Sequence, residues 1–166
     1  MTPAATLKIV SGGQTGVDRG ALDAALAAGV PCGGWCPAGR RAEDGPIAAR
    51  YPLHEMTSAH YSARTRQNVI DSDGTLVITY GDAEGGTART LELCHELDKS
   101  CLCIDAECHS PAQAATKIAR FIVDHRIVTL NVAGPRASKQ PQAQVYTRET
   151  IGLLLNLLHS NDTAMP

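Results

Sequence analysis

A glycine-rich decapeptide, Ser11-Gly12-Gly13-Gln14-Thr15-Gly16-Val17-Asp18-Arg19-Gly20, lies between an apolar run, Leu7 to Val10, and an alanine-rich segment, Ala21 to Ala28. The apolar run predicts a buried strand, and the alanine-rich segment predicts a helix. Glycine permits a tight turn and a close approach to the backbone. A helix start adds unpaired N–H groups and a partial positive charge. The stretch therefore predicts an anion-binding loop between a strand and a helix of an α/β protein.

A second glycine loop has the same setting. Glu84-Gly85-Gly86-Thr87-Ala88-Arg89-Thr90 follows the apolar run Thr75 to Tyr80 and opens another helix. The first loop has neither the Walker spacing G-x-x-x-x-G-K-[ST] nor the dinucleotide fingerprint G-x-G-x-x-G. Two such loops in one small domain predict a single site that holds a phosphate-bearing small molecule from two sides.

Length and composition fit one globular domain. The chain has 166 residues, of which 43% are apolar and 4% aromatic, so we expect a single domain with an aliphatic core. The net charge of -2 argues against nucleic-acid binding. No apolar run reaches the length of about 18 residues that a membrane-spanning helix needs. Residues 1–5 show no secretion signal, so we expect a cytoplasmic protein with reduced cysteines.

The six cysteines do not predict a metal site. Cys32-x-x-x-Cys36 and Cys101-x-Cys103 are poorly spaced for zinc, and the sequence has no C-x-x-C pair. We expect Cys101 and Cys103 to be small buried side chains on one face of a strand. We expect no separate protein-bound metal.

Strands and helices alternate along most of the chain. We expect strands at 6–10, 30–35, 74–80, 100–104 and 127–133, and helices at 17–28, 58–72, 86–97, 111–125 and 142–159. Gly29 should end the first helix, and Ser110-Pro111 should begin the fourth. Residues 37–46 have no periodicity and predict a long irregular loop. We expect residues 1–5 to be a disordered N-terminus, residues 6–159 to be the ligand-binding domain, and residues 160–166 to be a frayed tail.

This alternation predicts a Rossmann-like, doubly wound α/β fold in a single domain, with a parallel sheet of about five strands covered by helices on both faces. With right-handed crossovers and the order 2-1-3-4-5, the first and third strands would be neighbours. Their carboxyl ends would then meet at the topological switch point, where such folds bind ligands. Both glycine loops would leave the sheet there.

The candidate ligand-binding residues follow three strands and one long loop. They are Gly12, Gly13, Gln14, Thr15, Gly16 and Asp18 after the first strand, Gly85, Gly86, Thr87, Arg89 and Thr90 after the third, Gly134, Arg136 and Lys139 after the last, and Arg40 in the long loop. The glycines and the hydroxyl and amide side chains would hold a phosphate. The arginines and the lysine would form a basic rim suited to an anionic ligand.

Several of these residues also fit structural roles. Asp18 would contact a ring nitrogen or hydroxyl of the ligand, or it would pair with Arg19 at the helix end. Thr87 also fits a helix cap, and Arg89 fits a surface arginine. Arg64 and Asn68 share a helix face and favour a solvated surface slightly over a ligand contact. No Ser-His-Asp arrangement is recognisable, so we assign no catalytic residue.

The last helix has an aliphatic surface wider than one stripe. Ile151, Leu154, Leu155 and Leu158 form one face, and Leu153 and Leu157 lie on another. Such a surface usually needs a second partner. The pattern predicts a homo-oligomer, either a dimer or a tetramer.

Several motifs, in order, resemble the signature of the molybdenum carrier proteins. They are residues 11–20 as quoted above, Gly34-Trp35-Cys36-Pro37-Ala38-Gly39-Arg40, Ala42-Glu43-Asp44-Gly45, Tyr51-Pro52-Leu53, Arg64-Thr65-Arg66-Gln67-Asn68-Val69, Ser72-Asp73-Gly74-Thr75, Gly85-Gly86-Thr87 and Asn131-Val132-Ala133-Gly134-Pro135-Arg136. The resemblance covers residues 7–158. It implies a Rossmann-like fold, an oligomer, and binding of molybdenum cofactor (molybdopterin), a molybdate-bearing pterin with a phosphate tail, as cargo. The pterin dithiolene, rather than Cys32 or Cys36, would hold the metal. Molybdoenzymes or cofactor-synthesis enzymes would be the protein partners.

That family belongs to a wider group of Rossmann-like nucleotide binders, which includes phosphoribohydrolases once called lysine decarboxylases. Those enzymes carry P-G-G-x-G-T-x-x-E. In this chain Glu84 replaces the proline, Ala88-Arg89 follow Thr87, and Glu92 lies near the place of the catalytic glutamate.

We therefore expect a carrier or storage protein that binds an anionic pterin or nucleotide and protects it without a chemical step. One alternative is a nucleoside monophosphate hydrolase that cleaves the N-glycosidic bond, with Glu92 or Asp18 polarising water. Another is a nucleotide sensor that signals through its oligomer.

Overall fold

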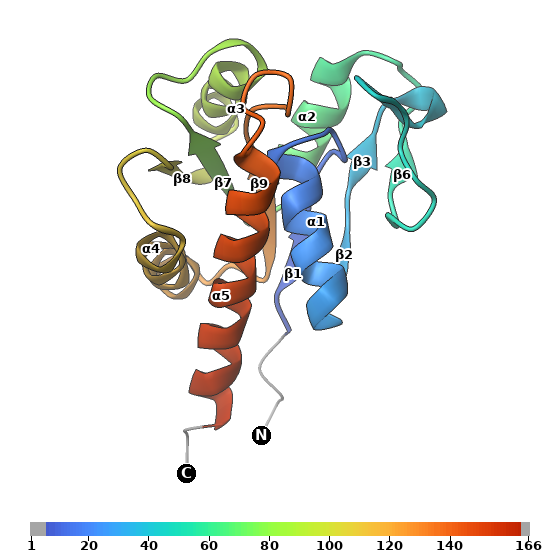
Figure 1. The fold of residues 1–166 in the computed structure, drawn as a ribbon. Coiled ribbons are helices and arrows are strands. Elements are labelled where there is room, and N and C mark those ends of the chain that lie inside the picture. The colour runs from blue at the N-terminus through green and yellow to red at the C-terminus, as the bar shows by residue number, and fades with distance from the viewer. Residues whose placement is uncertain (1–5, 164–166) are drawn as a thin grey trace.

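A five-stranded parallel sheet forms the centre of the molecule (Figure 1). The computed structural model describes residues 6–163. The sheet order is β2-β1-β9-β7-β8, with β1 (Lys8–Val10), β2 (Cys32–Gly33), β7 (Gly74–Thr79), β8 (Ser100–Asp105) and β9 (Thr129–Ala133). All neighbouring strands are parallel. These strands correspond to the five segments expected from the sequence.

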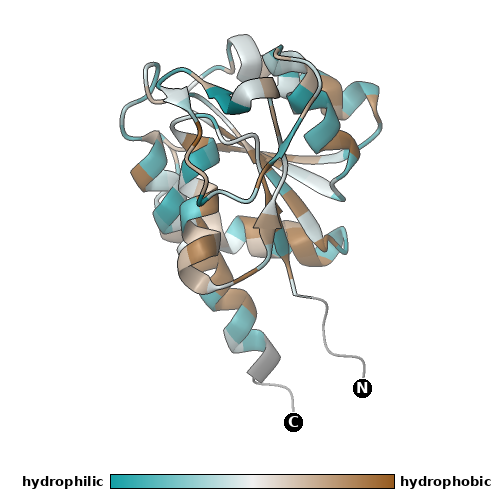
Figure 2. Cartoon of the chain, turned by 90° about the vertical axis from the view of Figure 1, so that its right-hand side faces the viewer, coloured by the Kyte–Doolittle hydropathy of each residue, from teal (hydrophilic) through white to brown (hydrophobic). Residues whose placement is uncertain are grey.

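Helices cover both faces of the sheet, which confirms the Rossmann-like α/β fold. α1 (Val17–Ala28), α4 (Pro111–Asp124) and α5 (Ala143–Thr163) pack on one face, and α2 (Tyr61–Ile70) and α3 (Gly85–Glu96) pack on the other. The main core is aliphatic, and Leu76 and Leu130 of the sheet and Ile151 of α5 are fully buried in it. In Figure 2 the central strands are mainly coloured as apolar.

The last strand lies inside the sheet, so the expected order 2-1-3-4-5 is wrong. β9 pairs with β1, with Ile9 opposite Leu130, and it also pairs with β7, with Leu76 opposite Val132. The first and third strands are therefore not neighbours. Burial gives the physical reason, because Leu130, Asn131 and Val132 are each at most 3% exposed. A strand that is buried on both faces belongs in the middle of a parallel sheet.

β8 consequently lies at the edge of the sheet. Cys101 on this strand is half-buried and Cys103 is exposed, so the expected burial of both side chains is wrong. An edge strand has a neighbour on one side only, and its alternate residues keep contact with solvent.

Local sequence signals set the ends of two helices as expected. Gly29 follows α1 with a left-handed φ of 65°. Ser110 caps α4 by accepting a hydrogen bond from the Gln113 amide, and the Gln113 side chain bonds back to the Ser110 amide. Pro111 occupies the first turn, where its missing N–H costs nothing.

The segment after β2, expected to be irregular, is ordered around a small core of its own. It contains β3 (Trp35–Cys36) paired with β6 (His54–Glu55), a short 3₁₀ helix (Ala38–Arg40), and a hairpin of β4 (Arg41–Ala42) and β5 (Gly45–Pro46). The buried residues of this second core are Leu22, Cys36, Ala42, Ile47, Tyr51 and Leu53. Ile47 and Leu53 of this segment lie against Gly13, so the segment fills the space beside the first glycine loop.

The described chain ends beyond the expected domain boundary. α5 continues to Thr163, so the expected frayed tail from residue 160 is helical over its first residues. The expected disordered residues 1–5, and residues 164–166 of the tail, lie outside the described residues. Within residues 6–163, no helix has both the length and the apolar character needed to cross a membrane.

Candidate ligand-binding site

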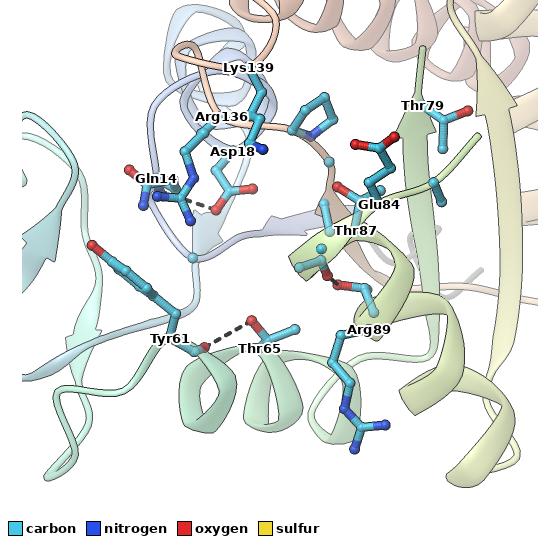
Figure 3. A pocket seen from close by; sticks show the side chains of 18 of the residues that line it. Gln14, Asp18, Tyr61, Thr65, Thr79, Glu84, Thr87, Arg89, Arg136 and Lys139 are labelled. Carbon is cyan, nitrogen blue, oxygen red and sulfur yellow. Dashed lines mark hydrogen bonds between the residues drawn. The ribbon is translucent and has the colours of Figure 1, made fainter. Parts of the chain in front are cut away.

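A cavity of about 600 Å³ opens at the carboxyl ends of β1, β9 and β7. The segment that follows each of these strands supplies one wall, and α2 supplies the fourth (Figure 3). The insertion of β9 between β1 and β7 is the reason why the loop at residues 133–140 lies between the two glycine loops. The expected site residues that line the cavity are Gly12, Gln14, Asp18, Gly85, Gly86, Thr87, Arg89, Thr90, Gly134, Arg136 and Lys139.

An ion pair between Asp18 and Arg64 lies on the β1 side of the cavity. Arg64 Nη1 is 3.0 Å from Asp18 Oδ2, and the side chains are only 13% and 4% exposed. The guanidinium lies directly on Gly12, where an added Cβ would be 1.7 Å from Nη1. Burial raises the pKa of Asp18 above its ordinary value, although Arg64 and the Gln14 amide favour the charged form.

Gln14 lines the same cavity and carries an unpaired donor. Its Oε1 accepts hydrogen bonds from the backbone amides of Thr15 (3.1 Å) and Glu43 (3.0 Å), which fixes the orientation of the side-chain amide. Nε2 is buried and has no hydrogen-bond partner among the described residues. A buried donor without an acceptor is costly, so Gln14 is suited to an acceptor atom of a ligand.

The start of α3 is open to the cavity. Glu84 precedes the helix, and no side chain caps it. The first amides of a helix have no partner within it, and here they belong to Gly85 and Gly86. A Cβ added at either glycine would meet nothing within 4 Å. This terminus can therefore receive an anion without rearrangement.

Basic side chains gather on the β9 side. Arg136 and Lys139 follow β9 and line the cavity. The ring of Tyr61 on α2 lies 5.5 Å from the Arg136 guanidinium carbon and 6.0 Å from that of Arg64. Arg41 lies 5.2 Å from the same ring. The arrangement concentrates positive charge at one end of the cavity.

Three expected residues of the first loop do not line the cavity. Gly13 has a φ of 77°, and a Cβ there would lie 2.4 Å from Leu53, in the second core. The Thr15 hydroxyl donates to Glu43 Oε1 and accepts from the Ala137 amide at 3.1 Å. At Gly16 an added Cβ would lie 2.4 Å from the Pro135 carbonyl oxygen. These residues pack the loop against its neighbours.

Two expected arginines are directed elsewhere. The Arg40 guanidinium donates to the carbonyl oxygens of Ile47, Ala48, Tyr51 and Leu53, so it ties the second core together and lies outside the cavity. Arg89 lines the cavity, but its guanidinium points away from it in Figure 3. The Arg89 guanidinium pairs with Glu92 (3.0 Å) and Glu96 (2.7 Å) on the surface of α3.

Of the two carboxylates considered for hydrolysis, Asp18 lines the cavity and Glu92 does not. Glu92 does not line the cavity, and its side chain is 62% exposed. Asp18 lines the cavity but is paired with Arg64. Arg19, the alternative partner of Asp18, instead binds Asp44 through two hydrogen bonds of 2.6 and 2.8 Å.

Sequence reasoning missed most of the α2 wall. The cavity residues outside the expected set are Tyr61, Ser62, Arg64, Thr65, Asn68, Thr79, Tyr80, Asp82, Ala83, Glu84, Asn131, Val132, Ala133, Pro135 and Gln140. Asn68 is 2% exposed and holds the backbone of Trp35 from both sides, accepting from its amide and donating to its carbonyl oxygen. One feature of the sequence could have predicted this wall. Tyr61, Arg64 and Asn68 share a face of α2, and this face is polar, whereas a helix face that packs on a core is normally apolar.

Metal-ligating groups do not gather in the described part of the chain. Within residues 6–163, no set of three or more His, Cys, Asp or Glu side chains is arranged to hold a metal ion. The donor set of the cavity, which consists of amides, guanidiniums and an ammonium, is suited to oxyanions.

Comparisons with known proteins agree with this arrangement. Residues 9–155 match the model of the circularly permutated YpsA SLOG family. The chain is similar to the crystal structure of a protein named "Putative molybdenum carrier protein" from Syntrophus aciditrophicus SB, with 47% sequence identity and a TM-score of 0.88. The similarity covers 91% of this chain and 96% of that chain. No curated protein matches the chain.

Proposed function

The chain belongs to the circularly permutated YpsA SLOG family, and on this premise and the cavity geometry we propose that it binds and protects an anionic, phosphate-bearing small molecule. The proposed ligand is molybdenum cofactor, and the proposed role is that of a carrier or store. The 47% identical neighbour is named as a molybdenum carrier, which supports this choice. Transfer to molybdoenzymes, or receipt from cofactor-synthesis enzymes, in the cytoplasm belongs to the same proposal.

The observation that carries the proposal is the set of donors that the cavity leaves without acceptors. Gln14 Nε2 and Arg64 Nε are buried and unpaired among the described residues. The uncapped start of α3, with Gly85 and Gly86, opens into the same cavity. A ligand with its phosphate at the start of α3 would meet the free amides of that terminus and would lie beside Gln14 and Arg64. A volume of about 600 Å³ suits a ligand of the size of a pterin or a nucleotide.

Binding without chemistry is favoured over hydrolysis. A general base must reach the water that it activates, and Glu92 is turned to the surface, where it pairs with Arg89. Asp18 Oδ2 already accepts from the Gln14 amide at 3.1 Å and from Arg64. Asp18 is therefore suited to orienting Arg64 and a ligand.

The first experiment is co-elution with purified molybdenum cofactor on gel filtration. Oxidised pterin is read by fluorescence, and molybdenum is read by mass spectrometry. The matched pair is Gly86→Asp and Gly86→Asn, since either side chain enters open space. The Asp side chain would repel a phosphate, while near a helix start it is itself favoured.

We expect near-stoichiometric pterin and molybdenum with wild type and Gly86→Asn. Gly86→Asp should bind at least about tenfold more weakly, which corresponds to about 1.4 kcal/mol. Absence of both signals from wild type would overturn the choice of cofactor. A panel of nucleoside monophosphates with detection of free base would then test the nucleotide and hydrolase alternatives.

We also propose that the protein is a homo-oligomer, with contact through α4 and α5. Leu153 and Leu157 line a shallow groove between these helices together with Ala112 and Ala115, and Leu157 is 40% exposed. Light scattering on the Leu153→Glu, Leu157→Glu variant should show a smaller particle than wild type. An unchanged mass would place the contact elsewhere or show a monomer.

A further inference from the structure

Three thiols gather between the edge strand β8 and the helix α3, away from the ligand cavity. Cys94 lies on the inner side of α3 and is 2% exposed. On β8, Leu102 and Ile104 pack on the main core. Side chains alternate between the two faces along a strand, so Cys101 and Cys103 point to the opposite face, which carries α3. The fold therefore brings thiols from a helix and from a strand to one place.

Cys94 and Cys101 interact directly through their thiols. Cys101 lies opposite Thr75 in the pairing of β7 with β8, and Cys94 interacts with both residues. The interaction with Cys101 lowers the pKa of Cys94 to about 7, against the opposing effect of burial. In return, the interaction with Cys94 raises the pKa of Cys101. The two thiols therefore titrate as a pair that holds one thiolate near neutral pH.

Other cysteines of the chain provide a contrast. Burial raises the pKa of Cys32 and of Cys36. Cys108 is exposed, but Asp105 Oδ2 lies 3.5 Å from its Sγ, and this carboxylate raises the pKa of the thiol. The thiolate is the reactive form of cysteine, so these three thiols are poor nucleophiles at neutral pH. Cys94 differs because its pKa is lowered and because a second thiol lies beside it.

A small oxidant can approach the pair from the edge of the sheet. β8 pairs with β7 only, at the end of the sheet (Figure 1), and an edge strand keeps contact with solvent. Cys103 is exposed and Cys101 is half-buried, whereas Cys94 lies beneath them. This graded burial suits hydrogen peroxide, which is small and uncharged, better than a macromolecular oxidant.

We propose that Cys94 and Cys101 are a peroxide-sensitive dithiol, which forms a reversible disulfide between α3 and β8. The disulfide would join α3 covalently to the edge strand. The first residues of the same helix, Gly85 and Gly86, line the ligand cavity. Disulfides in reducing compartments are usually transient and redox-sensing, and a pair of this kind fits that use.

The chemistry proceeds in two steps. The Cys94 thiolate attacks one oxygen of hydrogen peroxide, the O–O bond breaks, and the hydroxide that leaves takes the proton of Cys101 and becomes water. The Cys101 thiolate then attacks the sulfur of the Cys94 sulfenic acid, so an S–S bond forms and the S–O bond breaks. The second hydroxide takes a proton from solvent. The two sulfurs lose two electrons and the peroxide gains them, and a small dithiol reverses the reaction by exchange.

The test uses the full chain in the background Cys103→Ser, Cys108→Ser, which removes the two exposed thiols and leaves the pair. Reduced protein is treated with hydrogen peroxide at neutral pH. Free thiols are then alkylated, and disulfide-linked peptides are identified by mass spectrometry after proteolysis. Cys101→Ala removes the half-buried member of the pair. The matched control is Cys32→Ala, which removes another half-buried thiol whose pKa is raised.

We expect one linked pair of peptides, Cys94 with Cys101, whose mass is lower by two hydrogens than that of the two reduced peptides. It should form in the background and in the Cys32→Ala control, and dithiothreitol should reverse it. Absence of this linkage, or linkage of Cys94 to Cys32 or Cys36 in equal yield, would overturn the inference.

A second measurement follows the ultraviolet absorbance of the thiolate against pH, without peroxide. One thiol of the background should titrate near pH 7. In Cys101→Ala, burial of Cys94 acts without the neighbouring thiol, so this titration should move upward by at least about one pH unit, a tenfold change in proton affinity. Cys32→Ala should leave it in place. An unchanged titration in Cys101→Ala would show that the two thiols do not interact, which would also overturn the inference.

The outcome is independent of the cofactor experiment, because neither measurement uses a ligand of the cavity. If cofactor does not co-elute but the linkage forms, the dithiol stands and the choice of cofactor fails. If cofactor co-elutes but no linkage forms, the carrier function stands and the dithiol fails.

Discussion

The two glycine loops look alike in sequence but use their glycines differently. In the loop after β1, the Gln14 amide donates to Asp18, the Thr15 amide to the Gln14 side chain, and the Val17 amide to the Pro135 carbonyl oxygen. In the loop after β7, no side chain caps α3, and its glycines face open space. The first loop is closed by its own polar groups, and the second is open to a ligand.

The comparison shows that a glycine-rich turn has two physical uses. Gly13 and Gly16 are required because neighbouring atoms occupy the place of a Cβ. Gly86 has room for a side chain, so its value lies in the access that it leaves to the backbone. The space that surrounds each glycine, rather than the number of glycines, separates a packing loop from a binding loop.

The largest expected effect is that of Gly16→Ala. A Cβ there would lie 2.4 Å from the Pro135 carbonyl oxygen, and the φ of 83° is unfavourable for any other residue. We expect a loss of unfolding free energy of about 3 kcal/mol or more. Urea denaturation measures it. A loss below about 1 kcal/mol would mean that the first loop is as open as the second.

Asp18→Asn should cost about 2 kcal/mol, because it disturbs the buried hydrogen bonds that Asp18 Oδ2 accepts from Arg64 Nη1 and the Gln14 amide. The pKa of Asp18 is raised in the folded protein, so the folded state holds the proton more tightly than the unfolded chain. The contribution of Asp18 to stability therefore falls as pH rises from about 4 toward the folded pKa.

The advantage of wild type over Asp18→Asn should accordingly be larger near pH 4 than near pH 7. Urea denaturation of both proteins across this range measures the difference. An advantage that grows with pH would show that the Arg64 interaction outweighs burial. The exposed pair of Arg89 with Glu96 gives a control, since Glu96→Gln should leave stability nearly unchanged across the same pH range.

Thr15→Val separates packing from binding in the first loop. The variant removes the hydroxyl bonded to Glu43 and to the Ala137 amide, and it should cost about 1 kcal/mol of stability. Affinity for molybdenum cofactor in the co-elution experiment should stay within about twofold. A much weaker affinity would show that Thr15 contacts the anion, as its sequence context first suggested.

The smallest effect is expected from Gly86→Ala. The added methyl group meets nothing within 4 Å, and alanine in a helix is favoured over glycine by about 0.5 to 1 kcal/mol. We therefore expect a slightly higher melting temperature by calorimetry. A destabilised variant would contradict the open geometry of the second loop.

Sequence reasoning reached the fold class and fewer than half of the cavity-lining residues, but not the arrangement of the strands that brings these residues together. Ser110-Pro111 and Gly29 predicted the ends of two helices correctly, because helix capping depends on only a few neighbouring residues. The strand order was not, because β9 enters between β1 and β7 through pairings that cross most of the chain. Arg64 was read as a surface residue because its partner, Asp18, is 46 positions away. Arg40 was assigned to the site because its basic charge was visible and its four carbonyl acceptors were not.

The sequence by itself determined the alternation of strands and helices, the helix ends and the two glycine loops. These follow from side-chain periodicity and from the backbone freedom of glycine, which are local properties. The tertiary structure decided which glycines face a ligand, which arginines remain available and which carboxylate is buried. These features depend on burial and on long-range pairing. Arg136, Arg64 and Gln14 come from three separate segments, and they line one cavity only because β9 lies between β1 and β7 in the sheet.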